Sequence, residues 1–155
     1  LPPLLIGVGA SATAAIDAGM LVGPAQVAAR LAEFALVRRI HPLVSARVAV
    51  ALFPIGAGVL LAFGPLAAAP FAILYGAGNG LFTIVRGTLP LVLFGAQNYG
   101  GRLGALNVPA RLVGAIAPVL FALGLAKSEP GALGVLIAAC LLALICLFAL
   151  RKPAP

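Results

Sequence analysis

The sequence predicts an all-α integral membrane protein, and three observations carry that prediction. First, 63% of the 155 residues are hydrophobic and only 8% are charged, whereas soluble domains are about 45–50% apolar and about 25% charged. Second, apolar stretches of about 20 residues recur along the chain, which is the length that crosses a bilayer as a helix. Third, no segment alternates apolar and polar residues as a half-buried strand does. A water-soluble globule of this composition would lack the polar surface it needs.

About five segments have the length and apolarity of transmembrane helices. They cover residues 12–36, 44–63, 67–94, 103–126 and 131–150, and residues 1–8 have the character of the end of a preceding span. Stretches rich in turn and breaker residues separate these segments, among them FGPLAAAP at 63–70 and GAQNYGGR at 95–102. Because the chain opens with LPP and shows no signal-peptide pattern, we expect it to be a piece of a longer protein.

The distribution of Lys and Arg predicts how these helices are oriented, since basic residues favour the cytoplasmic side. The connections after the first and third segments, together with the tail, hold Arg38, Arg39, Arg47, Arg102, Arg151 and Lys152. The other two connections hold one basic residue, Lys127. We therefore expect residues 37–43, residues 95–102 and the C-terminus to be cytoplasmic, and residues 63–67 and 126–131 to be external.

Several function classes are disfavoured by the same composition. The net charge of +7 is accounted for largely by the orientation signal, and no nucleic-acid module is recognisable, so we expect no nucleic-acid partner. The chain has one histidine, His41, and three acids. No metal or acid–base cluster can be built from them, so we expect no enzyme activity, no metal and no cofactor. Cys140 and Cys146, six residues apart, are expected to be buried apolar residues rather than a disulfide.

Polar residues at membrane depth are concentrated in the segments 12–36, 67–94 and 103–126. The candidates for lining a substrate cavity are Gln26, Asn79, Thr83, Arg86, Asn107 and Arg111. Their spacings of three and four residues place each set on one helix face, and such groups face a cavity or a polar partner rather than lipid. Helix–helix hydrogen bonding without a ligand is the alternative for the Asn and Thr residues. The glycines at 76, 78 and 80 are expected to allow close packing or local flexing.

Three of the arginines fall into one layer. Arg30, Arg86 and Arg111 lie roughly 10, 12 and 13 Å from the cytoplasmic ends of their predicted helices. A single arginine at that depth can reach the interface with its long side chain, but three in one layer repel each other unless anions are present. Glu33 can neutralise only one of them. We therefore expect Arg86 to face a wet, partly anion-filled interior, and we expect Asp17, near the outer end of its helix, to be a solvated helix-start carboxylate.

The order polar, apolar, polar, polar, apolar along the five segments resembles the C-terminal half of a major facilitator superfamily transporter. In that comparison the segments correspond to helices eight to twelve, and residues 1–8 to the end of helix seven. The stretches GPAQVAARLAEF and YGAGNGLFTIVRGTLPLVLFG also resemble those of bacterial members. The resemblance implies a multi-pass protein of a bacterial plasma or inner membrane, forming most of a six-helix bundle.

A loop signature of that family, roughly G-x-L-a-D-R-x-G-R-R, has a partial counterpart in ARLAEFALVRR at residues 29–39. The matching residues are Leu31, Ala32, Glu33 and, with a one-residue offset, Arg38 and Arg39; the departures are Ala29, Phe34 and Leu36. The resemblance assigns a cytoplasmic gate to Arg30, Glu33, Arg38 and Arg39. The departures from the signature weaken the expectation of a tight gating turn.

The function implied by the resemblance is that of a secondary active transporter. Two six-helix halves would rock about a central site and move a small solute, an anion being one option, by alternating access. The implied partners are the lipid bilayer, the missing N-terminal half and a small-molecule substrate that the sequence does not identify. The alternative is a non-transporting membrane scaffold or assembly subunit that uses the same bundle.

Overall fold

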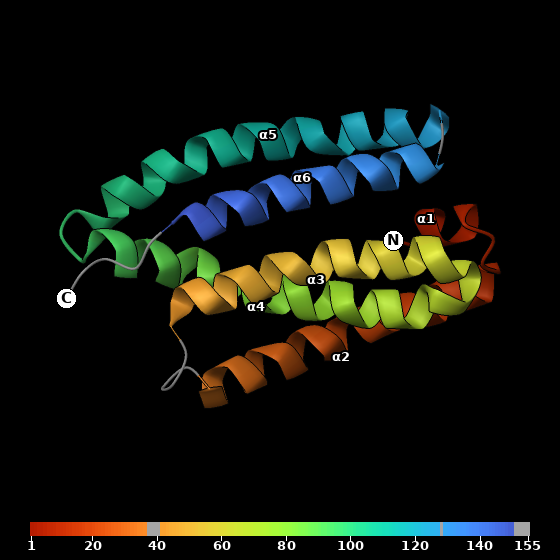
Figure 1. The fold of residues 1–155 in the computed structure, drawn as a ribbon, viewed down its shortest axis with the longest axis horizontal. Helices are drawn as coiled ribbons and strands as arrows, with labels where there is room; N and C mark the ends of the chain where they lie inside the picture. Colours follow the sequence, from red (N-terminus) through yellow and green to blue (C-terminus); the bar gives the residue numbers. More distant parts are fainter. Residues whose placement is uncertain (37–40, 128, 151–155) are drawn as a thin grey trace.

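The computed structural model describes residues 1–36, 41–127 and 129–150, and every regular element in these ranges is a helix (Figure 1). The elements are α1 (Pro2–Gly7), α2 (Ala12–Leu36), α3 (Pro42–Phe63), the 3₁₀ helix η1 (Gly64–Ala67), α4 (Ala68–Phe94), α5 (Tyr99–Lys127) and α6 (Glu129–Ala149). The predicted all-α class is therefore confirmed for the described residues.

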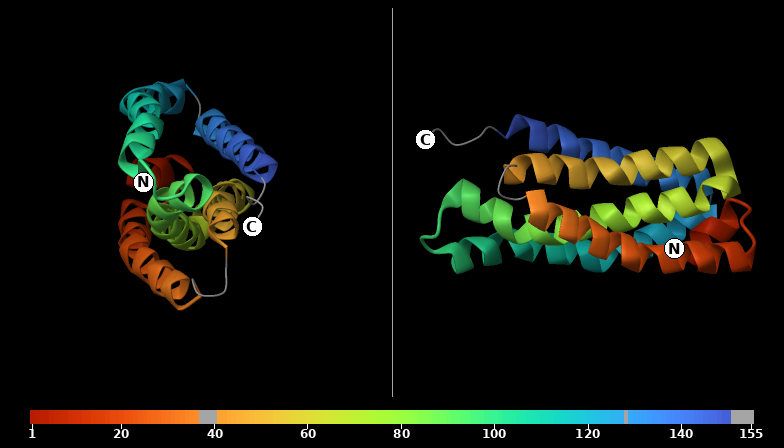
Figure 2. Two further views of the ribbon diagram at one scale, coloured as in Figure 1. Left: turned by 90° about the vertical axis from the view of Figure 1, so that its left-hand side faces the viewer. Right: turned by 90° about the horizontal axis from the view of Figure 1, so that it is seen from below.

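The long helices run antiparallel, and α4 lies at the centre. It packs against α2 on one side and α3 on the other, α6 packs against α3, and α5 lies beside α6 (Figures 1 and 2). In consequence α2, α4 and α6 finish at the end of the bundle where α3 and α5 start. We call this the basic end, because five arginines occupy that half of their helices: Arg30, Arg47, Arg86, Arg102 and Arg111.

The hydrophobic core lies at the opposite end of the bundle, which we call the core end. Leu5 of α1, Leu60 of α3 and Phe71 of α4 are almost completely buried there. Small residues of the same cluster, such as Ala15 and Ala72, let the backbones of α2 and α4 approach each other. This cluster joins α1 to α4 far from the arginines. A second set of buried residues on α3 and α4, among them Leu43 and Val85, lies at the basic end, and α5 contributes no buried residue among those described.

The connections use residues suited to turns. His41 precedes α3, and its Nδ1 accepts a hydrogen bond from the backbone N–H of Leu43 at 3.2 Å, which satisfies one of the free donors of the first helical turn. Between α3 and α4 the chain reverses through η1, which begins at Gly64 with φ +56°. Between α4 and α5 it reverses through Gly95 (φ +74°) and Asn98 (φ +52°), the residue types that adopt a left-handed backbone most readily.

Helix α5 starts four residues earlier than expected, so the predicted loop at 95–102 is shorter in the structure. The backbone N–H of Arg102 donates to the carbonyl of Asn98 at 3.1 Å, and the Arg102 guanidinium donates to the carbonyl of Phe94 at the end of α4. Because α5 begins at Tyr99, Arg111 lies twelve residues along it, or about 18 Å. Arg111 is therefore about one helical turn deeper than the sequence suggested.

One continuous helical stretch among the described residues, Pro42–Phe94, is long and apolar enough to cross a membrane, with a mean hydropathy of 2.0. It consists of α3, η1 and α4. Helices α2 and α5 have the necessary length, but their glycine, proline and charged residues dilute their apolar character. The apolar part of α6, Gly134–Ala149, is shorter. That all five helices span a membrane stays a prediction.

The expectation that both cysteines are buried is wrong for Cys146. Cys140 is half-buried and Cys146 is exposed, and both are free thiols. The physical reason is the position of α6, which packs against α3 and α5 and leaves its outer face uncovered by the described part of the chain.

Candidate functional site

Five of the six predicted cavity residues fall into two groups at the basic end, and the first group lies where α2 meets α4. Arg30 Nη2 donates to Thr83 Oγ1 at 3.2 Å and, at 3.5 Å, to Gln26 Oε1. Thr83 Oγ1 in turn donates to the backbone carbonyl of Asn79 at 2.6 Å. An arginine expected in the gate motif therefore contacts residues expected in the substrate cavity.

Two glycines explain why these side chains can meet. An ideal Cβ on Gly76 would lie 2.6 Å from the carbonyl oxygen of Val22, and one on Gly80 would lie 2.6 Å from that of Gln26. The α4 backbone therefore rests on the α2 backbone at both points, as in close-packed small-residue contacts. Gly78 faces the other way, where a Cβ would lie 3.1 Å from the carbonyl of Ala49 on α3. The close packing expected of these glycines is confirmed.

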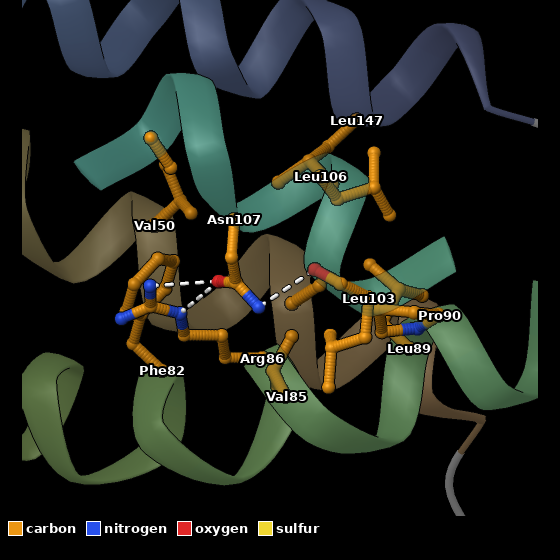
Figure 3. Close-up of a pocket in the computed structure, with 12 residues that line it drawn as sticks. Val50, Phe82, Val85, Arg86, Leu89, Pro90, Leu103, Leu106, Asn107 and Leu147 are labelled. Carbon is orange, nitrogen blue, oxygen red and sulfur yellow. Dashed lines mark hydrogen bonds between the residues drawn. The ribbon is translucent and has the colours of Figure 1, made fainter. Parts of the chain in front are cut away.

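The second group joins α4 to α5 through Arg86 and Asn107. Arg86 donates from Nε and Nη2 to Asn107 Oδ1, at 3.2 and 2.8 Å (Figure 3). Asn107 Nδ2 donates to the carbonyl of Leu103 at 2.8 Å, one turn earlier on α5. That bond fixes which way the amide points and leaves Oδ1 directed at the guanidinium. The sequence predicted both residues as candidates but did not pair them.

A pocket of about 240 Å³ lies beside this pair, between α3, α4, α5 and α6 (Figure 3). Its walls include Val50, Phe82, Pro90, Leu106 and Leu147, and Arg86 and Asn107 supply the polar groups. The pocket is therefore a partly open, apolar hollow with Arg86, which is exposed, at its edge. It lies on the α3 and α6 side of α4, whereas the Arg30–Thr83 contact lies on the α2 side.

Two contacts at the basic end were missed by sequence reasoning. The hydroxyl of Tyr99, in the first turn of α5, donates to the carbonyl of Gly87 on α4 at 2.7 Å. Arg47 of α3 donates to the carbonyls of Leu147 (3.2 and 3.3 Å) and Leu150 (3.2 Å) and stacks 4.5 Å above the ring of Phe148. The available signal for Arg47 was its charge in an apolar segment; its partners, the last carbonyls of α6, lack intrahelical donors.

The remaining predicted residues have simpler surroundings. Arg111 is exposed on α5, one turn beyond Asn107, with no hydrogen-bond partner among the described residues. Glu33 is half-buried one turn beyond Arg30, and Asp17 is exposed near the start of α2. Arg38 and Arg39 of the predicted gate lie outside the described residues. No group of three or more His, Cys, Asp or Glu side chains that could hold a metal occurs in the described part of the chain.

Together, the fold and the site define an all-helical bundle with an arginine–asparagine pair beside an apolar pocket. Comparisons of this chain with protein-family models, with curated proteins and with solved structures give no match.

Proposed function

We propose that residues 1–155 form part of a secondary transporter of the major facilitator type, which moves a small anionic solute across a membrane by alternating access. The observation that carries the proposal is the Arg86–Asn107 pair beside an apolar pocket. Arg86 is exposed in the isolated bundle, but it lies eight residues from the end of α4, and an arginine at such a depth in a membrane-spanning helix is costly and marks a functional feature by default.

The outer surface of the bundle supports a membrane environment. Large apolar side chains are exposed on all the long helices, for example Phe34 on α2, Phe63 on α3, Ile116 on α5 and Phe148 on α6. Soluble monomers rarely expose large contiguous apolar patches. A lipid bilayer would cover these side chains, and it would also explain why the arginines gather at one end, which we assign to the cytoplasmic side.

The polar side chains support a path for an anion at that end. Arg30 bonds to Thr83 on the α2 side of α4, and Arg86 bonds to Asn107 where α4 meets α5. Both guanidiniums are exposed, and neither has an ion pair with an acid among the described residues. Two unneutralised guanidiniums at one end of the bundle attract anions, which makes an anionic solute the substrate that best fits the arrangement.

Uptake measurements on the full-length protein in proteoliposomes test this function. We expect Arg86→Ala to abolish uptake of labelled organic anions while membrane insertion stays near that of the parent protein. Arg86→Lys should restore only part of the activity, because an ammonium cannot reproduce the planar fork of a guanidinium. Thr88→Val is the matched control on the same helix, because the Thr88 hydroxyl bonds to the carbonyl of Ile84 on its own helix, at 3.2 Å, and to no other described residue.

Two outcomes would contradict the proposal. Full uptake by the Arg86→Ala protein would mean that the guanidinium has no role in transport. A correctly inserted parent protein that moves none of a broad panel of organic anions would instead favour a scaffold or assembly subunit.

A further inference from the structure

The pocket beside Arg86 combines one cation with apolar walls, and only some of the N–H donors of this cation have hydrogen-bond acceptors. A guanidinium has five N–H donors, and two of those on Arg86 are directed at Asn107 Oδ1. The other three have no acceptor among the described residues. In Figure 3 the free side of the guanidinium lies near Val50 and Phe82, at the edge of the pocket, and Arg86 is exposed.

No described carboxylate is placed to neutralise this charge. The two acids whose side chains the structure describes, Asp17 and Glu33, both lie on α2, and α2 contributes no residue to the pocket. Asn107 orients the guanidinium but carries no charge. Arg86 is thus an exposed cation with free donors at the edge of an apolar pocket, and an anion is the ligand group that completes it.

The size of the pocket and its single cation restrict the ligand further. Its volume of about 240 Å³ is below the range of about 300–1,000 Å³ that is typical of drug-sized ligands. One guanidinium balances one negative charge, and a second charge buried in the same apolar walls would be left unpaired at high cost. A dianionic phosphate therefore fits poorly, whereas a monoanionic carboxylate matches the planar donors of arginine.

We propose that this pocket binds a small monocarboxylic acid with an apolar body, its carboxylate on Arg86 and its body between α3, α5 and α6. The inference rests on the proposed function, because such an acid would be the substrate of the transporter. Benzoate is a suitable probe, since its ring is compact and apolar, and benzamide is a neutral molecule of nearly the same shape.

Binding of radiolabelled benzoate to the full-length protein in phosphatidylcholine nanodiscs tests the proposal. We expect saturable binding that benzamide does not displace, and at least about a tenfold weaker affinity in Arg86→Gln, because a hydrogen bond to a charged group is lost. A second variant, Ala110→Phe, should abolish binding by filling the pocket from α5 without touching the arginine. Ala105→Phe is its control, because Ala105 lies on the same helix outside the pocket lining.

Three results would overturn the inference: benzoate affinity unchanged in both Arg86→Gln and Ala110→Phe, equal displacement by benzamide, or loss of benzoate binding when phosphatidylglycerol is added to the nanodiscs. The last result would identify an anionic lipid as the occupant.

Uptake assays separate this inference from the proposed function. Benzoate binding that depends on Arg86, without transport of any solute, would support the pocket and reject the transporter. Transport of other anions, with benzoate binding that does not depend on Arg86, would support the transporter and reject the pocket.

Discussion

Gly80 shows how one missing side chain positions the polar residues around it. Its Cα rests against the backbone of Gln26, and this contact fixes the distance between α2 and α4 one turn below Arg30 and Thr83. A longer separation would take Thr83 Oγ1 out of hydrogen-bonding reach of the guanidinium. The glycine thus acts on the polar contact through the backbone.

Replacing Gly80 with alanine should destabilise the full-length protein by about 1–3 kcal/mol, which is the usual cost of overpacking. The new Cβ would lie 2.6 Å from the Gln26 carbonyl oxygen, so the two helices must move apart. Thermal unfolding in detergent measures the loss. Gly58→Ala is the matched control on α3: nothing lies within 4 Å of the position that its methyl group would take, so this variant should be neutral or slightly more stable. Equal stability of the two variants would contradict the close contact.

At the scale of single residues, the sequence predicted which polar side chains belong to the candidate site, but it did not predict their hydrogen-bond partners. Arg86 and Asn107 were both identified from their polarity at membrane depth, and the glycines of α4 from their spacing. The pairing of Arg86 with Asn107 depends on the rotation of α4 against α5, which a single-helix pattern does not contain. The same holds for Arg30 and Thr83, which the loop signature and the cavity pattern had assigned to different roles.

The contact between α3 and α6 depends on one arginine. Arg47 donates to two carbonyls at the end of α6 and stacks on Phe148. The negative end of the α6 helix dipole also stabilises a cation at this position. We expect Arg47→Gln to lower the stability of the full-length protein by about 1–2 kcal/mol, since the bonds to a charged donor are lost and Arg47 is only half-buried. Denaturant titration followed by circular dichroism measures this loss.

The exposed Arg111 provides the comparison, and Arg111→Gln should change stability by less than about 0.5 kcal/mol. Similar losses in the two variants would argue against a specific role for Arg47.

Helix α5 is held to α4 mainly by polar contacts near its start. Removing the hydroxyl in Tyr99→Phe deletes the bond to the Gly87 carbonyl and should weaken this attachment by about 1 kcal/mol. Hydrogen–deuterium exchange should then be faster over residues 99–107 than in the parent protein. Tyr75→Phe is the control, because the ring of Tyr75 packs against Phe53 and Phe71 and does not reach α5. Unchanged exchange in the Tyr99→Phe protein would mean that other contacts hold α5.

The boundaries of the elements could be predicted where breakers are unambiguous and not where turn residues continue into a helix. Residues 12–36 form α2 over the expected range, because the chain before it carries Gly9 with φ +92°. Residues 99–102 were expected in a loop on account of the two glycines in YGGR. In the structure they form the first turn of α5, since Asn98 accepts the hydrogen bond that starts the helix. Local composition alone does not distinguish these cases.

At the scale of the whole molecule, the gathering of arginines at one end predicts how the chain lies in the membrane. In a cysteine-free full-length protein, Gln97→Cys should be protected from an impermeant maleimide added outside, and Leu66→Cys should react. Both positions are exposed, Leu66 to 90%, so a difference in labelling reports sidedness rather than burial. After the membrane is permeabilised, both should react. If only Gln97→Cys were labelled in intact cells, the orientation in the membrane would be opposite to the one proposed.

The uneven packing of the bundle also has a mechanical consequence. Leu5, Leu60 and Phe71 clamp α1 to α4 at the core end, whereas α5 has no buried anchor among its described residues and is tied to α4 through Tyr99 and Asn107. We therefore expect α5, which otherwise lies mainly against α6, to move more easily than the helices joined at the core end. Such a movement would change the width of the pocket, because α5 supplies Leu103, Leu106, Asn107 and Ala110 to its walls.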